Sequence, residues 1–253
     1  MTFWIFGDSY AEIDGGGRDT SFAWTEAVAK HFNQPVRNLA LGSTSLSYTY
    51  DRVESVRNDI LPGDVVIVCL THVIRQWFFR DRPMLSHAWS FDHQEHPYGR
   101  DERDAFEKFI MYLDNPRNQD LGLINFLYNL NDLAGKGVKI IVMACFPETE
   151  DVYRDMTDRW SNLRFAIGSL VSISYQEIDE ADRSRIEQLV RRDPRAGHFL
   201  RSTHPILTNK LIQTIENGYL LNLTTGFTRG IITLDKITDR GFISSEFFYD
   251  LSA

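Results

Sequence analysis

The sequence predicts a single α/β domain built on a parallel sheet that helices cover on both faces. Short apolar runs with the composition of strands alternate along the chain with stretches whose apolar residues recur at helical spacing. This alternation is typical of βαβ units, in which each crossover helix packs on the sheet. The chain has 253 residues, 43% of them hydrophobic, which is enough for one sizeable core.

Four segments are predicted as strands. Residues 65–70 are the clearest, because all six are apolar and most are β-branched. The other three are shorter or flanked by turn residues, and they span residues 3–6, 36–39 and 138–144.

Helices are predicted between and after these strands. The first ends near Phe32, and Thr20 or Ser21 is its expected N-cap. Pro62 and Gly63 form a strong helix-breaking pair after the second helix, and Gly135 stops the third. From the second onward, the predicted helices span approximately residues 47–60, 121–134, 178–192 and 205–216.

Two segments interrupt this alternation. Residues 75–117 and 147–177 are too long for ordinary connections, so we predict that they are insertions or lids within a domain spanning residues 1–217. Residues 218–253 contain a β-rich stretch at 230–234 and are predicted to form a C-terminal extension on the core.

Charge and composition exclude several classes of partner. The net charge is −8, so a basic face for nucleic acid is not expected. The longest uncharged apolar stretch, residues 65–74, is far too short to span a bilayer, and we expect no membrane partner. The N-terminus lacks the features of a secretory signal, which predicts a cytoplasmic protein. Cys69 and Cys145 lie in or beside apolar runs and are expected to be buried thiols.

Polar residues follow the predicted strands, where an open α/β sheet binds its ligands. Ser9 follows the first strand and is the natural nucleophile, because its backbone N–H at the turn can point toward a developing oxyanion. Gly42, after the second strand, lets the backbone approach a ligand and donate a second N–H. The alternatives are that Ser9 caps the following turn and that Gly42 is an ordinary turn glycine.

A serine nucleophile also needs an imidazole, usually oriented by a carboxylate. The late segment 193–204 supplies Asp193, His198 and His204. Asp193 has a structural alternative as well, because neighbouring arginines could pair with it at the surface.

These residues resemble the motifs of the SGNH, or GDSL-like, hydrolases. Gly7-Asp8-Ser9 is similar to the family's first block, residues 38–42 (Asn-Leu-Ala-Leu-Gly) to its second, and the late Asp and His to its last. The resemblance covers residues 3–217 and is closest to divergent bacterial and phage members. It implies a three-layer, flavodoxin-like fold and hydrolysis of esters, including acetyl groups on sugars. It also implies that no metal or organic cofactor is needed.

The chain departs from the family at two blocks. The third block, Gly-x-Asn-Asp, supplies an oxyanion donor through its asparagine, but residues 70–75 here are Leu-Thr-His-Val-Ile-Arg. Thr71, His72 and Arg75 are the candidate replacements, and loss of one donor costs about 100- to 1,000-fold in turnover.

The last block is also irregular. Arg201 stands three residues before His204, where the family has aspartate, whereas Asp193 and His198 have the longer spacing that resembles bacterial and phage members. We favour His198 as the base. His204 is the alternative, because Pro205 as the first helical residue would place it at the helix cap, facing the site.

The segment 75–117 is rich in aromatic residues. Trp77, Trp89 and Phe91 are predicted to stack on a sugar, although they could equally form a small core or an oligomer contact. Residues 92–96 (Asp-His-Gln-Glu-His) have no standard zinc spacing, so we expect a solvated loop and no metal.

Three hypotheses follow. The first is a serine esterase acting on a small acyl ester, with a glycan ester as a candidate substrate. The second is an SGNH-fold protein that has lost catalysis and serves as a binding or structural module, for instance in a phage particle, where a homo-oligomer or particle assembly within the virion is expected. The third is a lectin built on the aromatic segment.

Overall fold

The computed structural model of this chain describes residues 1–12, 23–42, 44–73, 75, 104, 105, 108, 115–182, 200, 202–233 and 235. Its main elements are β1 (Phe3–Phe6), α1 (Trp24–His31), β2 (Val36–Asn38), α2 (Leu46–Val56), η1 (Arg57–Asp59), β3 (Val65–Leu70), α4 (Pro116–Gly135), β4 (Lys139–Ala144), α5 (Pro147–Tyr153), η3 (Arg154–Trp160), β5 (Leu163–Ser169), α6 (Leu170–Glu177) and α8 (Thr203–Asn217).

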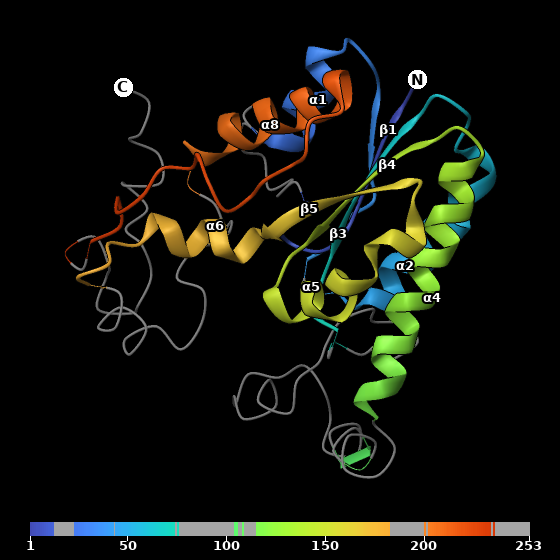
Figure 1. Cartoon of the computed structure of the whole chain (residues 1–253), viewed down its shortest axis with the longest axis horizontal. Coiled ribbons are helices and arrows are strands. Elements are labelled where there is room, and N and C mark those ends of the chain that lie inside the picture. Colours follow the sequence, from blue (N-terminus) through green and yellow to red (C-terminus); the bar gives the residue numbers. More distant parts are fainter. Residues whose placement is uncertain are drawn as a thin grey trace.

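The strands form one parallel sheet in the order β2-β1-β3-β4-β5. This is the strand order of flavodoxin-like folds, in which the order reverses beside β1. Figure 1 shows α1 and α8 together on one side of the sheet and α2 and α4 on the other. The predicted α/β fold with a parallel sheet and three layers is therefore confirmed.

Each face of the sheet has its own core. Alternate residues of β1 point to opposite faces, so Phe3 and Ile5 join the core under α1 and α8, whereas Trp4 and Phe6 join the core under α2 and α4. The central strand β3 is fully buried along its whole length. Its continuous apolar run is what a strand covered on both faces requires.

The segment 147–177 is not an insertion, contrary to our prediction. It contains α5, η3, the edge strand β5 and α6, and β5 pairs with β4. The strand was missed because Arg164 and Gly168 interrupt its apolar pattern and because Arg164 and Ile167 are exposed at the sheet's edge. Without that strand, the segment looked too long for a connection.

The described part of the C-terminal extension belongs to the core. Leu221, Leu223 and Phe227 are buried with the residues under α1 and α8. Asn222 forms a parallel bridge with Ile167 of β5, and Ile178 forms one with Ile232. The predicted helix over 178–192 is therefore wrong at its start, since the chain leaves α6 at Glu177, and its part from 183 lies outside the described residues.

Two further boundaries differ from the sequence prediction. The N-cap of α1 is Ala23, without a side-chain cap, so the predicted cap is wrong; Thr20 and Ser21 lie outside the described residues. Helix α4 starts at Pro116 and is capped by Asn115, whose side chain accepts a bond from the Arg117 N–H. Both cysteines are buried and free, as predicted. In the part of the chain that the structure describes, no helix is long and apolar enough to cross a membrane.

A buried carboxylate fastens the start of β1 to the turn before β3. Asp64 accepts bonds from the Thr2 N–H at 2.7 Å, the Trp4 indole N–H at 2.9 Å and the Leu61 N–H at 3.0 Å. Burial by itself would raise the pKa of Asp64, but the bonds from Leu61, Trp4 and Thr2 outweigh it and lower that pKa below its usual value.

We therefore predict that Asp64→Asn lowers the free energy of unfolding by about 1–3 kcal/mol at pH 7, because one or more donors lose their acceptor. A depressed carboxyl pKa stabilises the fold above the unfolded pKa, and that contribution is lost as the pH falls through the folded one. The difference between wild type and variant should therefore shrink below about pH 4. Urea unfolding at pH 7 and pH 3 measures it, and an equal difference at both would contradict the account.

Candidate active site

A glycine at the end of β1 brings the first two strands of the site together. Gly7 has φ +146°, and a β-carbon there would lie 2.6 Å from Cys69 Cβ of the adjacent strand β3. Only glycine fits such an approach without displacing the neighbouring strand. The next residue, Asp8, consequently lies beside Thr71, which follows β3.

Asp8 is fully buried beneath this edge, and each of its carboxylate oxygens accepts two bonds. Oδ2 accepts from the Thr71 hydroxyl at 2.6 Å and from Arg75 Nη1 at 3.1 Å. Oδ1 accepts from the Tyr10 N–H at 3.1 Å and from the Cys145 thiol at 3.3 Å. Burial and the negative charge of Asp8 raise the pKa of the Cys145 thiol, so it stays protonated and can donate.

Arg75 is held from three sides. Nη1 donates to Asp8 and to Thr71 Oγ1 and lies 3.5 Å from the Thr44 carbonyl oxygen, while the guanidinium carbon sits 5.4 Å from the centre of the Phe146 ring. The side chain is 25% exposed. Among the described residues, no acceptor bonds to Nε or Nη2. The arrangement leaves a fixed, permanently charged donor at the edge of the sheet.

Thr71 and Arg75 are both predicted to help to bind the oxyanion, but their hydrogen bonds give them different roles. Thr71 is fully buried, its hydroxyl proton goes to Asp8, and its carbonyl accepts a bond from the Thr149 hydroxyl. Thr71 therefore positions Asp8 and Arg75. Arg75 is the one of the two that retains donors for a ligand.

Gly42 and Ser9 lie together, as the strand order predicts. Ser9 Cβ is 3.4 Å from the position that a β-carbon on Gly42 would occupy. The Leu41 N–H donates to the Gly7 carbonyl at 3.0 Å, and the Asn38 side chain donates to the Ala11 carbonyl at 2.7 Å. These two bonds fasten the loop after β2 to the loop after β1.

His204 is the second residue of α8, which begins at Thr203 with Ser202 as its N-cap. The alternative that Pro205 is the first helical residue and His204 the cap is therefore wrong. Its Nδ1 accepts a bond at 3.2 Å from the N–H of Trp24, the first residue of α1. The Trp24 indole in turn donates to the Tyr10 carbonyl at 3.0 Å. His204 thus accepts a bond from an N–H in the first turn of α1, which has no partner within that helix. The bond joins α1 to α8 close to Tyr10, the residue after Ser9.

Burial lowers the pKa of His204 to about 4, so the ring is neutral at pH 7. Because Nδ1 accepts the Trp24 bond, the proton of the neutral ring lies on Nε2. In a Ser-His-Asp triad the proton lies on Nδ1, and Nε2 accepts from serine. The tautomer of His204 is therefore the opposite of the one that a base acting through Nε2 needs.

The other predicted site residues, Asp193, His198, Trp77, Trp89 and Phe91, lie outside the described residues, as do residues 92–96, and their placement stays a prediction. Among the described residues, no group of three or more His, Cys, Asp or Glu side chains could hold a metal ion. The sequence does not single out Trp24 or Phe146 as residues that support the site. Both belong to ordinary apolar patterns, and only their contacts reveal that they support the site.

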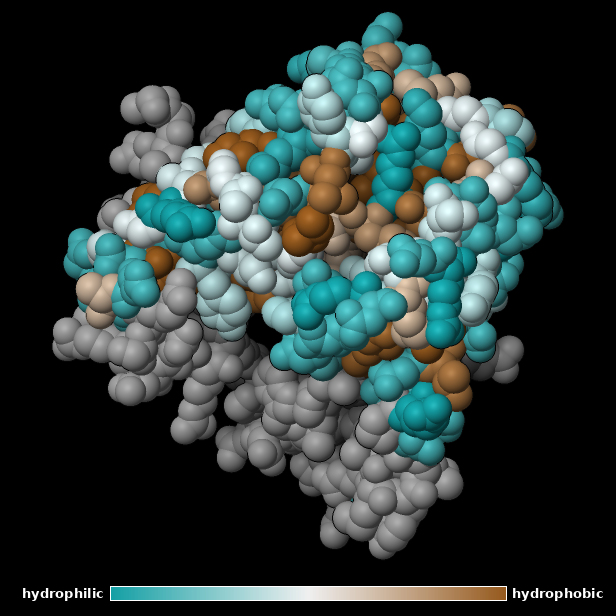
Figure 2. Space-filling view, viewed as in Figure 1, coloured by the Kyte–Doolittle hydropathy of each residue, from teal (hydrophilic) through white to brown (hydrophobic). Residues whose placement is uncertain are grey.

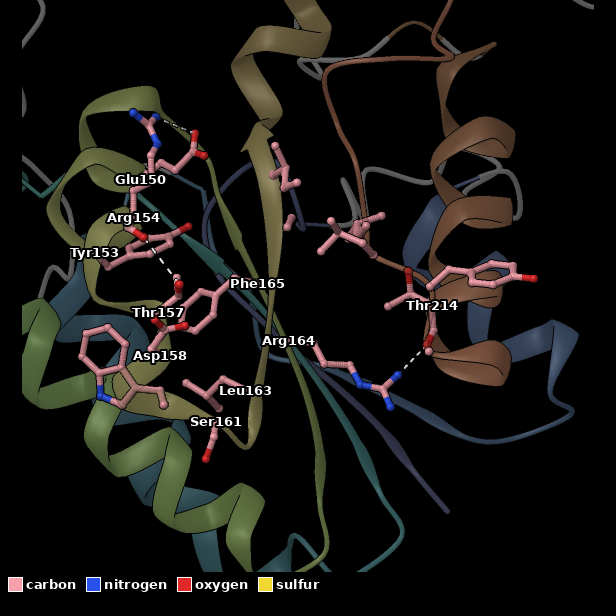
Figure 3. Close-up of a pocket in the computed structure, with 17 residues that line it drawn as sticks. Glu150, Tyr153, Arg154, Thr157, Asp158, Ser161, Leu163, Arg164, Phe165 and Thr214 are labelled. Carbon is pink, nitrogen blue, oxygen red and sulfur yellow. Dashed lines mark hydrogen bonds and ion pairs between the residues drawn. The ribbon is translucent and has the colours of Figure 1, made fainter.

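A separate groove of about 770 Å³ follows the edge strand β5 (Figure 3). Arg164 crosses it to the Thr214 carbonyl, while Tyr153 and Phe165 lie on the opposite side. Figure 2 shows apolar side chains over β5, and two residues that line the groove, Ile167 and Leu220, are exposed. Among the described residues that line this groove, none is a histidine or a cysteine.

Comparisons with known proteins found similarity only among solved structures. No family model and no curated protein matches it. One solved structure, described as "The active site of a carbohydrate esterase displays divergent catalytic and non-catalytic binding functions", aligns with 85% of this chain at 11% identity and a TM-score of 0.42. The alignment covers 64% of that protein, so this chain spans less than two thirds of it. Similarity at this level says nothing of function, and the assignment depends on the residues themselves.

We predict that Arg75→Met lowers the free energy of unfolding by about 3 kcal/mol, because it leaves the Asp8 carboxylate buried without its counter-ion. The double variant Asp8→Asn/Arg75→Met should recover at least half of that loss, since the buried charge is then gone. Guanidinium unfolding of the two single variants and the double variant measures the coupling.

The matched control is Arg159→Met, which removes an exposed arginine and should change stability by less than about 0.5 kcal/mol. If the double variant loses as much free energy of unfolding as the two single variants together, Asp8 and Arg75 are not coupled and the account of the ion pair is contradicted.

Proposed function

We propose that this chain is a serine ester hydrolase of the SGNH type that acts on a small acyl ester, with an acylated carbohydrate as the favoured substrate. The observation that carries the proposal is that Ser9 lies against Gly42 at the carboxyl edge of the sheet, where Arg75 pairs with Asp8, the residue before Ser9. A hydroxyl supplies the nucleophile for acyl transfer, and a glycine backbone N–H and a held cation can stabilise the oxyanion; the base is supplied separately.

In the proposed reaction, Ser9 Oγ attacks the ester carbonyl carbon and His198, oriented by Asp193, takes the hydroxyl proton. The tetrahedral oxyanion accepts bonds from the backbone N–H groups of Ser9 and Gly42. The Arg75 guanidinium supplies the donor that the family's asparagine would supply. The intermediate collapses as the alcohol leaves with the proton from His198, and water then hydrolyses the acyl-serine by the same steps. No metal or organic cofactor is needed for this sequence.

The contacts of His204 support His198 as the base. His204 already accepts a bond at Nδ1 and joins α1 to α8, which is a structural task. Asp193 and His198 retain the spacing that resembles bacterial and phage members of the family. Trp77, Trp89 and Phe91 are proposed to stack on the sugar.

One observation favours a second candidate function. The Thr71 hydroxyl is used by Asp8, and no asparagine follows β3, so the oxyanion site depends on Arg75 in place of the family's amide. If Arg75 serves only to neutralise Asp8, the chain is an SGNH-fold binding or structural module without catalysis, for instance a particle component.

We predict that a fluorophosphonate probe labels Ser9 in the wild type and that Ser9→Ala abolishes the labelling. His198→Ala should reduce the labelling rate by at least about 100-fold, because a positioned base contributes 10²- to 10⁴-fold. His204→Asn, which keeps an acceptor for the Trp24 N–H, should label at close to the wild-type rate. Mass spectrometry of the digested protein measures each adduct.

The pH dependence gives an independent test. If His198 is the base, the pH at which labelling falls to half should differ from the pKa of His204. A midpoint near pH 4 would instead identify His204, whose pKa burial lowers to about 4. Folded wild type that does not label at any pH would support the module without catalysis.

A further inference from the structure

Glu12 places a carboxylate directly beside the proposed nucleophile. The Glu12 N–H donates to the Asp8 carbonyl at 3.0 Å, which closes a turn around Ser9. Glu12 Oε2 lies against the position that a β-carbon on Gly42 would occupy, and Ser9 Cβ lies 3.4 Å from that same position. The absence of a side chain on Gly42 is therefore what admits the Glu12 carboxylate between the two loops.

The charges around this position are unequal. The Asp8 carboxylate is buried and paired with Arg75, so it projects little charge toward a ligand. Glu12 is exposed, and among the described residues no cation or hydrogen-bond donor pairs with its carboxylate. A carboxylate only accepts hydrogen bonds, so a ligand at this position is favoured when it brings a donor.

A carboxylate next to Ser9 and Gly42 also repels negative charge. An anionic substrate brings a like charge close to Glu12, whereas a hydroxyl or ammonium group on the substrate binds the carboxylate and reduces its repulsion of the developing oxyanion. A site built to bond a substrate hydroxyl discriminates strongly against an analogue that lacks it.

We propose that Glu12 is a specificity-determining residue, which selects esters that carry a hydroxyl or ammonium group next to the scissile bond and rejects anionic esters. The inference rests on the proposed function, and it narrows the substrate class to neutral polyol or amino-bearing esters. A mono-O-acetylated sugar with a free neighbouring hydroxyl is the simplest member of that class.

The test compares wild type with Glu12→Gln on three esters. These are a mono-O-acetylated methyl glucoside with a free neighbouring hydroxyl, 4-nitrophenyl acetate, and the 4-nitrophenyl monoester of succinate, which is anionic. Loss of the charged acceptor should lower kcat/KM about 10-fold on the sugar ester and raise it about 10-fold on the anionic ester. The change on 4-nitrophenyl acetate should stay below about threefold. Glu180→Gln, a change of an exposed glutamate after α6, is the matched control and should alter none of the three values.

The outcomes separate the inference from the function on which it rests. Opposite changes on the sugar ester and the anionic ester support the inference. An equal change in kcat/KM on all three esters, or no change, overturns the role of Glu12. The proposed function still stands in that case if turnover depends on Ser9. Absence of turnover on every ester by wild type overturns both.

Discussion

The buried ion pair between Asp8 and Arg75 is the interaction on which the carboxyl edge of the sheet depends. A carboxylate with no exposed surface is costly unless it is paired and fully hydrogen-bonded. Asp8 meets that condition with four donors: one from the turn after β1, two from the loop after β3 and one from the residue after β4. The same bonds decide where Ser9 and Arg75 lie. A structural requirement therefore fixes both the proposed nucleophile and the proposed cationic donor.

Helices α1 and α8 are also joined to the loop after β1 by hydrogen bonds. Trp24 bonds to Tyr10 through its indole and to His204 through its backbone, so the start of α1 connects the loop after β1 with the start of α8. A histidine used in this way keeps α8 in place and stays neutral. The base proposed for Ser9 is then His198, which precedes α8 in the sequence, and His204 is not expected to complete a triad.

Much of the fold could be predicted from the sequence, because β1, β3 and β4 are continuous apolar runs and the polar residues after them had to meet at one edge. The meeting of Ser9 and Gly42 follows from that rule alone. The edge strand β5 could not be found in the same way, since Arg164 and Gly168 interrupt its apolar pattern. The partners of Asp8, the contact of Glu12 with Gly42 and the bond to His204 join residues far apart or side chains in loops, and no local pattern encodes them.

The most direct test of the account is a crystal structure of the protein after reaction with a fluorophosphonate, in which the phosphonyl group on Ser9 stands in for the tetrahedral intermediate. We predict that one phosphonyl oxygen accepts bonds from the Ser9 and Gly42 N–H groups and from Arg75, with the Arg75–Asp8 pair intact. An adduct whose oxygens face solvent, or Arg75 bonded only to Asp8, would contradict the claim that this edge was built to hold an oxyanion.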